Sequence, residues 1–152
     1  MQITVVGTED LFDLAPLVRA YCDFYEVAPS GEDLRAFSEM LIAAPAAGIQ
    51  LIARDEDGRP LGYATLYWPF SSLTASRIAI MDDLFVRPDA RGSGVADALI
   101  EECRTRAGRH GAATLTWQTA KTNARAQRLY ERVGRAGPSG STTRSTPEGR
   151  SA

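Results

Sequence analysis

The sequence predicts an α/β fold in which one mixed sheet carries helices on both faces. Three observations predict it. A hairpin pattern lies in the middle of the chain, two amphipathic helical patterns precede it, and a strand–helix–strand–helix pattern follows it. The 152 residues are 44% hydrophobic and 24% charged, as in one soluble globular domain of ordinary size. The expected order of elements is β-α-α-β-β-β-α-β-α.

The N-terminal third predicts a strand and two helices. Gln2–Val6 is short and β-branched, which is typical of a strand. Thr8 is expected to cap a helix whose apolar residues recur at helical spacing from Leu11 to Tyr25. Ser30 is expected to cap the second helix after the break at "APSGED". The apolar face expected for this second helix consists of Leu34, Phe37, Met40 and Leu41.

The middle of the chain predicts three strands. Ile49–Arg54 and Leu61–Trp68 flank "DEDGRP", whose residues favour a tight turn, so the two runs form a hairpin. A third strand is expected over Arg77–Val86.

The remaining elements are a helix, a strand and a last helix. The helix is expected over Gly94–Arg109 and the strand over Ala112–Thr119, and Asn123 is expected to cap the last helix. From Arg135 onward the chain is rich in Gly, Ser, Thr, Pro and Arg, and it cannot bury enough apolar surface to offset its ordering entropy. The expected domain is therefore residues 1–134, with residues 135–152 as a disordered tail.

Charge and cysteine content exclude several classes of function. A formal net charge of −2 gives no basic field, which argues against a nucleic-acid partner. Cys22 and Cys103 lie far apart and His110 is the single histidine, which argues against zinc and against a Cys-His or Ser-His nucleophile. No metal is expected. The sequence shows neither a signal peptide nor a membrane span, so the expected location is the cytoplasm.

The segment "VRPDARGSGVADALIEE" places two glycines at the start of a helix. Backbone N–H groups at a helix start have no partners within the helix and attract anions, and Arg91 adds a positive charge. The pattern is not a P-loop, because no Lys-Ser/Thr follows, and Asp97 occupies the position where a dinucleotide fingerprint has its third glycine. Two interpretations remain: a phosphate cradle, or a plain strand–helix turn.

Two motifs together resemble the GNAT N-acetyltransferase family. Arg91-x-x-Gly94-x-Ala96 resembles the acetyl-CoA pyrophosphate motif of that family, and "NARAQRLYERVG" (Asn123–Gly134) resembles its second motif. The resemblance extends from about Ile3 to Gly134. It implies the GNAT fold, in which two parallel strands, here Arg77–Val86 and Ala112–Thr119, splay apart to admit the pantetheine arm.

The resemblance also implies roles for individual residues. Backbone groups of Leu84 and Val86 are expected to meet the pantetheine, and Tyr130 is expected to protonate the departing CoA thiolate; the alternative for Tyr130 is a core tyrosine. The residues implied in acetyl-CoA binding are Leu84, Phe85, Val86, Arg91, Gly92, Ser93, Gly94, Val95, Ala96, Asn123, Arg125, Ala126 and Tyr130.

Two adjacent acids near the end of the third strand point to an amine acceptor. A carboxylate can hold an ammonium group and accept its proton, and adjacent strand residues are expected to face opposite sides of the sheet. The segment also resembles that of the spermidine/spermine-type diamine acetyltransferases, which implies Asp82 as the proton acceptor and Asp83 as a substrate contact. An ion pair with Arg77 or Arg87 is the equally weighted alternative. Three further residues are assigned to the acceptor wall: Tyr25, Glu26 and Trp68. For Trp68 the alternative of sealing the core stays open.

The expected activity is direct transfer of acetyl from acetyl-CoA to a primary amine of a small molecule, polyamine-like or amino-acid-like, in a ternary complex. Two alternatives stay open: a non-catalytic CoA-binding or regulatory module, and an acetyltransferase acting on a protein lysine. The first has a specific motive, because family members usually add two strands after the last helix and "RAGPSGSTTRSTPEGRSA" contains no apolar strand pattern. A second copy of the chain is one way to complete that edge, so a homodimer is a further hypothesis.

Overall fold

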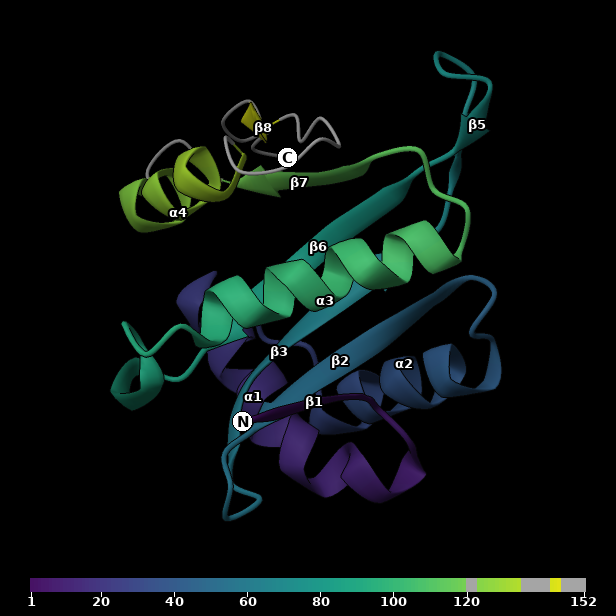
Figure 1. The fold of residues 1–152 in the computed structure, drawn as a ribbon. Helices are drawn as coiled ribbons and strands as arrows, with labels where there is room; N and C mark the ends of the chain where they lie inside the picture. Colours follow the sequence, from purple (N-terminus) through teal and green to yellow (C-terminus); the bar gives the residue numbers. More distant parts are fainter. Residues whose placement is uncertain (120–122, 135–142, 146–152) are drawn as a thin grey trace.

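A computed structural model of the chain describes residues 1–119, 123–134 and 143–145 (Figure 1). Its main sheet has six strands in the order β1-β2-β3-β6-β7-β8. The strands of this sheet are β1 (Gln2–Val5), β2 (Gly48–Arg54), β3 (Pro60–Tyr67), β6 (Ala79–Val86), β7 (Leu115–Thr119) and β8 (Thr143–Ser145). The α-helices are α1 (Leu11–Phe24), α2 (Gly31–Ala43), α3 (Val95–Arg109) and α4 (Ala124–Gly134). The predicted α/β class and the predicted order of the nine elements are confirmed.

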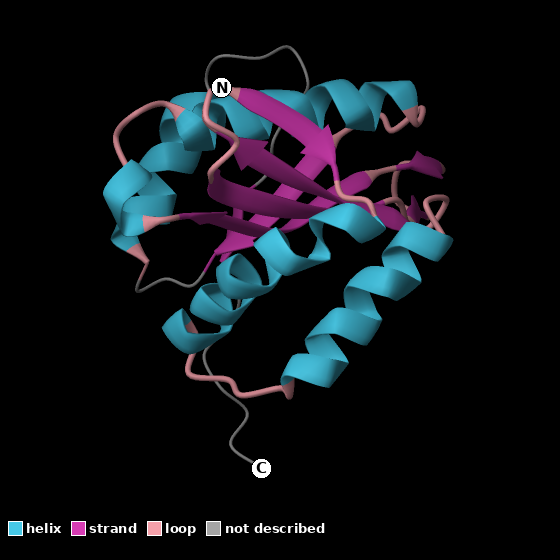
Figure 2. Cartoon of the chain, turned by 90° about the horizontal axis from the view of Figure 1, so that it is seen from below, coloured by secondary structure: helices cyan, strands magenta, loops and turns pink. Residues whose placement is uncertain are grey.

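The sheet is antiparallel from β1 to β6 and parallel from β6 through β7 to β8. Helices cover both of its faces (Figure 2). On one face Ile52, Tyr63 and Phe85 pack with the apolar side of α1. On the other face Leu51 and Leu66 belong to a larger cluster that includes the buried side chains of α3. The period-two alternation of the strands thus separates two cores, one on each side of the sheet.

The helix starts differ in one respect from the prediction. Ser30 caps α2 as expected, since its hydroxyl accepts a hydrogen bond from the Asp33 amide at 3.0 Å. Thr8, however, lies inside the short 3-10 helix η1 (Thr8–Asp10) and does not cap a helix. The Asp10 carboxylate caps this helix start instead, because it accepts hydrogen bonds from the Gly7 amide at 2.8 Å and from Arg54 at 2.7 Å. Asp10 is preferred because a charged acceptor makes the stronger bond.

Met40 does not lie on the buried face of α2. Its side chain is 57% exposed, while Ser38 is buried and donates its hydroxyl to the Leu34 carbonyl at 3.2 Å. The face of α2 that meets the sheet is therefore rotated from the predicted one. Because serine satisfies its hydroxyl on the preceding turn, it can occupy a buried helix position that a hydropathy pattern assigns to an apolar residue.

The third predicted strand begins two residues late. Ser76–Arg77 forms a separate strand, β5, which pairs with β4 (Phe70–Ser71) in a small hairpin outside the main sheet. The Arg77 guanidinium lies 4.4 Å from the centre of the Phe70 ring and donates to the Trp68 carbonyl at 3.0 Å. These contacts hold Arg77 in the hairpin and away from the sheet.

Part of the predicted disordered tail is ordered backbone. Thr143–Ser145 pairs in parallel with Trp117–Thr119 as strand β8, so for these three residues the expectation of disorder is wrong. The physical reason is the free edge of β7, whose backbone groups accept a neighbouring strand whatever its side chains are. The rest of the tail lies outside the described residues.

Gly62 of β3 lies against the backbone of β6. A Cβ atom added at Gly62 would lie 2.4 Å from the Phe85 carbonyl oxygen and 3.2 Å from the Val86 Cα atom. Because both are backbone atoms, Gly62→Ala is expected to lower the free energy of unfolding by about 2 kcal/mol. Urea denaturation checks this against Gly31→Ala, whose added Cβ meets nothing within 4 Å. Equal midpoints for the two variants would contradict the predicted clash.

Candidate active site

The site begins where two parallel strands separate. β6 and β7 pair through only three positions, from Ala79 opposite Leu115 to Met81 opposite Trp117. Beyond Met81, β6 continues to Val86 with β3 beside it, while β7 runs toward α4 (Figure 1). Backbone groups on one edge of β6 are therefore left open between the diverging strands, and an extended ligand can pair with them as a strand would.

A cavity of about 990 Å³ lies at this opening, at the upper end of the size range of small-molecule sites. Segments from four parts of the chain line it: the end of α1, the end of β6, the start of α3 and most of α4. Its lining residues are Tyr21, Phe24, Tyr25, Leu84, Phe85, Val86, Ala90, Arg91, Gly92, Gly94, Ala96, Asp97, Asn123, Ala124, Arg125, Ala126, Arg128, Leu129, Tyr130 and Arg132. Most residues predicted to bind the donor are thus brought together.

The glycine loop before α3 has the geometry that the sequence suggested for an anion cradle. Gly92 and Gly94 have φ of +83° and +87°, a conformation that disfavours any side chain, and no atom lies within 4 Å of an added Cβ at either position. Gly94 is the N-cap of α3, and Ala96 and Asp97 in the first turn line the cavity, where the amides of a helix start have no partner within the helix. Two predicted contacts do not line the cavity: the Ser93 hydroxyl donates to the Ala90 carbonyl, and Val95 is buried in the core.

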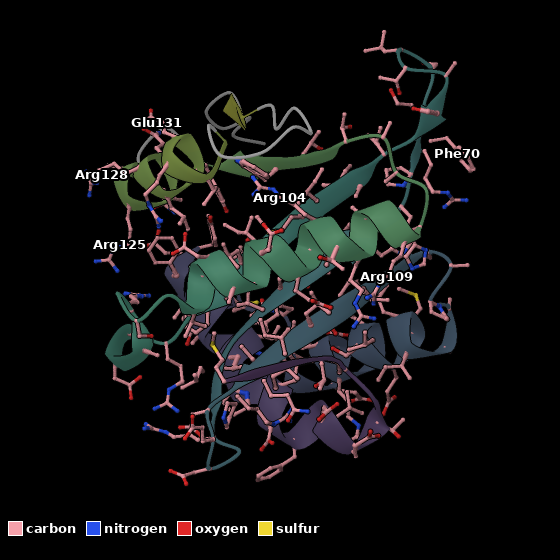
Figure 3. All side chains as sticks on the ribbon, viewed as in Figure 1. Phe70, Arg104, Arg109, Arg125, Arg128 and Glu131 are labelled. Atoms are coloured by element: carbon pink, nitrogen blue, oxygen red, sulfur yellow. The ribbon has the colours of Figure 1, made fainter. Side chains whose placement is uncertain are left out.

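Two arginines add positive charge at the same end. Arg91 donates Nε–H to the Val86 carbonyl at 3.0 Å, and burial followed by the charge of Arg125 lowers its pKa. Figure 3 labels Arg125 and Arg128 on α4, and all three arginines line the cavity. Within the described residues neither Arg91 nor Arg125 has an acidic partner, whereas Arg132 pairs with Asp97 at 2.7 Å. Two like charges facing one cavity are stabilised when an anion lies between them.

Helix α4 places Tyr130 at the other end of the cavity. Asn123 caps the helix as predicted, accepting from the Ala126 amide at 3.1 Å. Two turns later Tyr130 is buried, with its ring centre 5.0 Å from that of Trp117. Burial, with smaller contributions from Tyr25, Cys103 and Asp83, raises the pKa of Tyr130. Its hydroxyl therefore keeps its proton at neutral pH and is available as a donor.

A β-bulge changes the expected directions of Asp82 and Asp83. Thr65 pairs with Asp83 and Leu66 with Met81, so Asp82 is the extra residue on β6. Met81 and Leu84 both belong to the cluster on the α3 face, so the bulge turns the two acids between them toward the α1 face. The expectation that adjacent acids face opposite sides is therefore wrong, because the bulge breaks the strict alternation of the strand.

Neither acid is neutralised by the partners that the sequence suggested. Arg77 is held by Phe70 and Trp68, and Arg87 pairs with Asp89 at 2.8 Å. Burial raises the pKa of Asp82. Burial and, more weakly, the charge of Asp82 raise the pKa of Asp83, while hydrogen bonding with the hydroxyls of Thr65 and Tyr21 acts in the opposite direction. The acids thus form a partly desolvated negative site, which favours a cationic ligand.

The predicted acceptor wall is placed only in part. Tyr25 lines the cavity, but Glu26 is an exposed residue after α1 with φ of +56°. Trp68 is 3% exposed, donates Nε1–H to the Pro45 carbonyl at 3.2 Å, and stacks on His110 with ring centres 4.2 Å apart. These contacts bury it away from the cavity, so the acceptor role assigned to Trp68 is corrected to a structural one. Phe70 belongs to the projecting β4–β5 hairpin (Figure 3) and is 75% exposed.

Sequence reasoning missed Tyr21 and Thr65. Tyr21 lines the cavity, and its hydroxyl donates a weak hydrogen bond to the Asp82 carbonyl oxygen at 3.4 Å, beside the Asp83 carboxylate. In the sequence it counts only as one apolar position of a helix. Thr65 is fully buried directly opposite Asp83, and only the register of β3 against β6 reveals that pairing. A polar residue in an otherwise apolar strand was the one available signal.

A model of the acetyltransferase (GNAT) family matches residues 14–134 of the chain. The chain belongs to the GNAT acetyltransferase family. It is therefore an N-acetyltransferase of the GNAT type. It is 38% identical over 134 residues to the uncharacterized N-acetyltransferase YhfO of Bacillus subtilis, covering 88% of this chain and 89% of that protein. A solved structure of a probable acetyltransferase aligns with 34% identity and a TM-score of 0.80, covering 88% of this chain and 89% of that one.

A more distant relative has a named acceptor. The chain is 36% identical over 78 residues to a D-amino-acid N-acetyltransferase of Saccharomyces cerevisiae, a match that covers 51% of this chain and 48% of that protein. The GNAT fold uses acetyl-CoA as the acetyl donor. Within the described residues, no helix of this GNAT protein has the length and hydropathy needed to cross a bilayer, and no three His, Cys, Asp or Glu side chains cluster as metal ligands would.

Proposed function

We propose that this GNAT protein transfers acetyl from acetyl-CoA to a primary amine of a small polyamine-like molecule. The main support for the proposal is that one continuous cavity is lined by the anion-attracting start of α3, by Tyr130 and by the tyrosines at the end of α1. One end of that cavity suits a phosphorylated donor. The other end lies beside two unneutralised carboxylates, which suit a cationic acceptor.

Four features support acetyl-CoA as the donor. The φ angles of Gly92 and Gly94 leave the amides of α3 open to a pyrophosphate, and Arg91 and Arg125 supply the counter-charge. The open edge of β6 at Leu84–Val86 is suited to pair with the amide groups of a pantetheine arm. Tyr130 lies at the far end, where a thiol would be released.

The charge of the acceptor end supports a polyamine-like substrate. Asp82 and Asp83 lie at the bulge of β6, Thr65 of β3 is paired with Asp83, and the Tyr21 hydroxyl contacts the Asp82 backbone. Tyrosine faces and carboxylates both attract ammonium groups. Two carboxylates in one place favour a substrate that carries more than one positive charge, because one ammonium is acetylated while another keeps its charge.

An amino acid is the second candidate, favoured by the match to the D-amino-acid N-acetyltransferase. Its carboxylate would need a cation, and repulsion from Asp82 and Asp83 would oppose its binding beside them. Arg128 lines the cavity and is exposed, so an acceptor carboxylate would have to approach the α4 side. The two candidates therefore differ in which side of the cavity they contact.

The reaction follows from these positions. The free amine attacks the thioester carbonyl carbon, the carbon–sulfur bond breaks, and the departing thiolate takes the hydroxyl proton of Tyr130. The amine nitrogen must lose one proton before the attack, because an alkyl ammonium has no lone pair and its pKa is near 10. The acidic site beside the acceptor end is suited to receive that proton.

Tyr130→Phe is expected to lower kcat about 100-fold while leaving the Kd for acetyl-CoA nearly unchanged. The ring still packs on Trp117, so the variant loses only the proton donor. Steady-state kinetics and calorimetric titration of the same sample measure the two quantities. A wild-type kcat would return Tyr130 to the role of a core tyrosine.

The proposed function is tested by amine-dependent release of CoA thiol, with the acetylated product identified by mass spectrometry. A diamine, a monoamine of matched length, an amino acid and a lysine peptide form the panel. The proposal expects the diamine to have the highest kcat/KM. A higher kcat/KM for the amino acid would favour the second candidate, and a higher value for the peptide would point to a protein lysine.

A further inference from the structure

Asp83 does not line the cavity itself, whereas Tyr21 lines it from α1. The Tyr21 hydroxyl donates a weak hydrogen bond to the Asp82 carbonyl oxygen at 3.4 Å, which places it beside the Asp83 carboxylate. The ring of Tyr21 is fixed by neighbours, with centres 4.9 Å from Tyr25 and 6.1 Å from Tyr63. An acceptor amine in the cavity therefore meets the Tyr21 oxygen before it can reach the carboxylate.

Asp83 is held from the other side by the sheet. Thr65 lies directly opposite it in the register of β3 and β6, next to the bulge, and its hydroxyl interacts with the carboxylate. Thr65 is fully buried, and its oxygen also accepts a weak hydrogen bond from the Gln50 side-chain amide at 3.4 Å. A row of polar groups thus runs from the cavity into the sheet, through Tyr21, Asp83, Thr65 and Gln50.

We propose that Tyr21 and Asp83 act as a proton relay for the acceptor amine, with Thr65 as the positioning residue that orients the Asp83 carboxylate. The inference rests on the proposed function and replaces Asp82 with Asp83 as the final proton acceptor. Tyr21 is the group that touches the substrate. Asp82 remains a charge that attracts the cationic acceptor.

The proton step is balanced. The Tyr21 hydroxyl first turns from the Asp82 carbonyl oxygen to the Asp83 carboxylate. The ammonium then gives one N–H proton to the Tyr21 oxygen as the Tyr21 hydroxyl proton moves to an Asp83 carboxylate oxygen. Tyr21 is neutral before and after the step, the amine becomes the neutral nucleophile, and Asp83 becomes a neutral carboxylic acid. The proton returns to solvent before the next turnover.

A neutral Tyr21 fits this relay. Burial, followed by the charge of Asp83, raises the pKa of Tyr21, so a free phenolate is disfavoured and the hydroxyl proton leaves only as another arrives. The titratable and charged groups around Asp83 come from every element packed against it. They are Tyr21 and Cys22 on α1, Tyr63 and Tyr67 on β3, Asp82 on β6 and Tyr130 on α4.

The experiment compares Tyr21→Phe, Thr65→Val and Thr65→Ser with the wild-type chain, in kcat/KM for a diamine from about pH 4 to pH 10. Tyr21→Phe is expected to lower kcat/KM about 100-fold near neutral pH, and by less at high pH, where free amine is already present. Thr65→Val removes a hydrogen bond to the ionised carboxylate, so the acidic limb of the profile is expected to move to higher pH. Thr65→Ser keeps the hydroxyl and is expected to restore the wild-type limb.

Each outcome has one meaning. Calorimetric titration with acetyl-CoA establishes that every variant is folded, with a wild-type Kd. The relay is overturned if Tyr21→Phe loses the same factor in kcat/KM at all pH values, or if the acidic limb of the Thr65→Val profile stays where it is in the wild-type chain. In either case, turnover of the diamine by the wild-type chain still supports the proposed function. A folded wild-type chain that acetylates no amine overturns the proposed function itself, and the relay with it.

Discussion

Asp83→Asn is expected to lower kcat/KM for the amine by about 100- to 10,000-fold at neutral pH, the usual contribution of a positioned base. The amide has nearly the shape of the carboxylate and can keep contacts with the hydroxyls of Thr65 and Tyr21. It cannot take up the proton of the ammonium. Binding of acetyl-CoA is expected to be unchanged, because the donor end of the cavity is made of other residues. Steady-state kinetics at several pH values measure the loss.

The same variant is expected to be more stable than the wild-type chain at neutral pH. Burial raises the pKa of Asp83 in the folded state, so the folded chain binds the proton more tightly than the unfolded chain does. The charged Asp83 carboxylate therefore lowers the free energy of unfolding. This loss grows as the pH rises from the ordinary carboxyl range, near 4, through the pKa that Asp83 has in the folded chain. Asparagine removes that cost above this window and changes little below it. Thermal unfolding at low and neutral pH measures the difference.

Asp82→Asn is the matched control. It removes an equal charge one residue away, from the side chain that the bulge places outside the register of β3. It is expected to raise KM for the amine with a smaller loss of kcat. Equal losses of kcat in the two variants, with no gain in the Tm of Asp83→Asn, would contradict the assignment of Asp83 as the proton acceptor.

Removing the positive charge at the donor end is the second large effect. Arg91→Ala and Arg125→Ala are each expected to weaken acetyl-CoA binding by about 10- to 100-fold, as expected for a lost hydrogen bond to a charged group. The two effects are expected to be non-additive, because either substitution also relieves the repulsion between the two guanidinium groups. Calorimetric titration gives the Kd of each variant. Because each variant keeps only one of the two arginines, its binding of acetyl-CoA is expected to depend less on salt concentration than binding by the wild-type chain.

Arg109→Ala is the control for these variants. Arg109 is an exposed arginine at the opposite end of α3 from the glycine loop (Figure 3). Its loss changes the net charge by the same amount without touching the cavity. An equal weakening in all three variants would mean that overall charge, and not a local phosphate site, governs binding of the donor.

Local patterns predicted the fold and the positions of the glycine loop and of the Asn123 cap. The hairpin, the helices and the glycine loop each depend on residues close in sequence, so periodicity and capping residues were sufficient to place them. Gly92, Gly94 and Asn123 take the positions that their motifs implied. The residues lie on neighbouring segments because the strand–helix–strand crossover brings the two motifs together.

The acceptor end could not be predicted in the same way. The bulge at Asp82 is visible only in the register of β3 against β6, and it alone puts both acids on one side of the sheet. Tyr21 reaches Asp83 across 62 positions of sequence through the packing of α1 on the sheet. The sequence alone is compatible with Trp68 in the wall of a pocket, and only its contacts with Pro45 and His110 in the folded chain show that it is a core residue. Long-range register and packing decide such contacts, and a single sequence does not contain them.

The most direct test of the account is the release of CoA thiol by the wild-type chain with acetyl-CoA and a diamine, compared with a monoamine of matched length and with an amino acid. The diamine is expected to give the highest kcat/KM, and mass spectrometry is expected to find one N-acetyl group formed for each CoA released. A chain that binds acetyl-CoA but releases CoA no faster with the diamine than without an amine would contradict it.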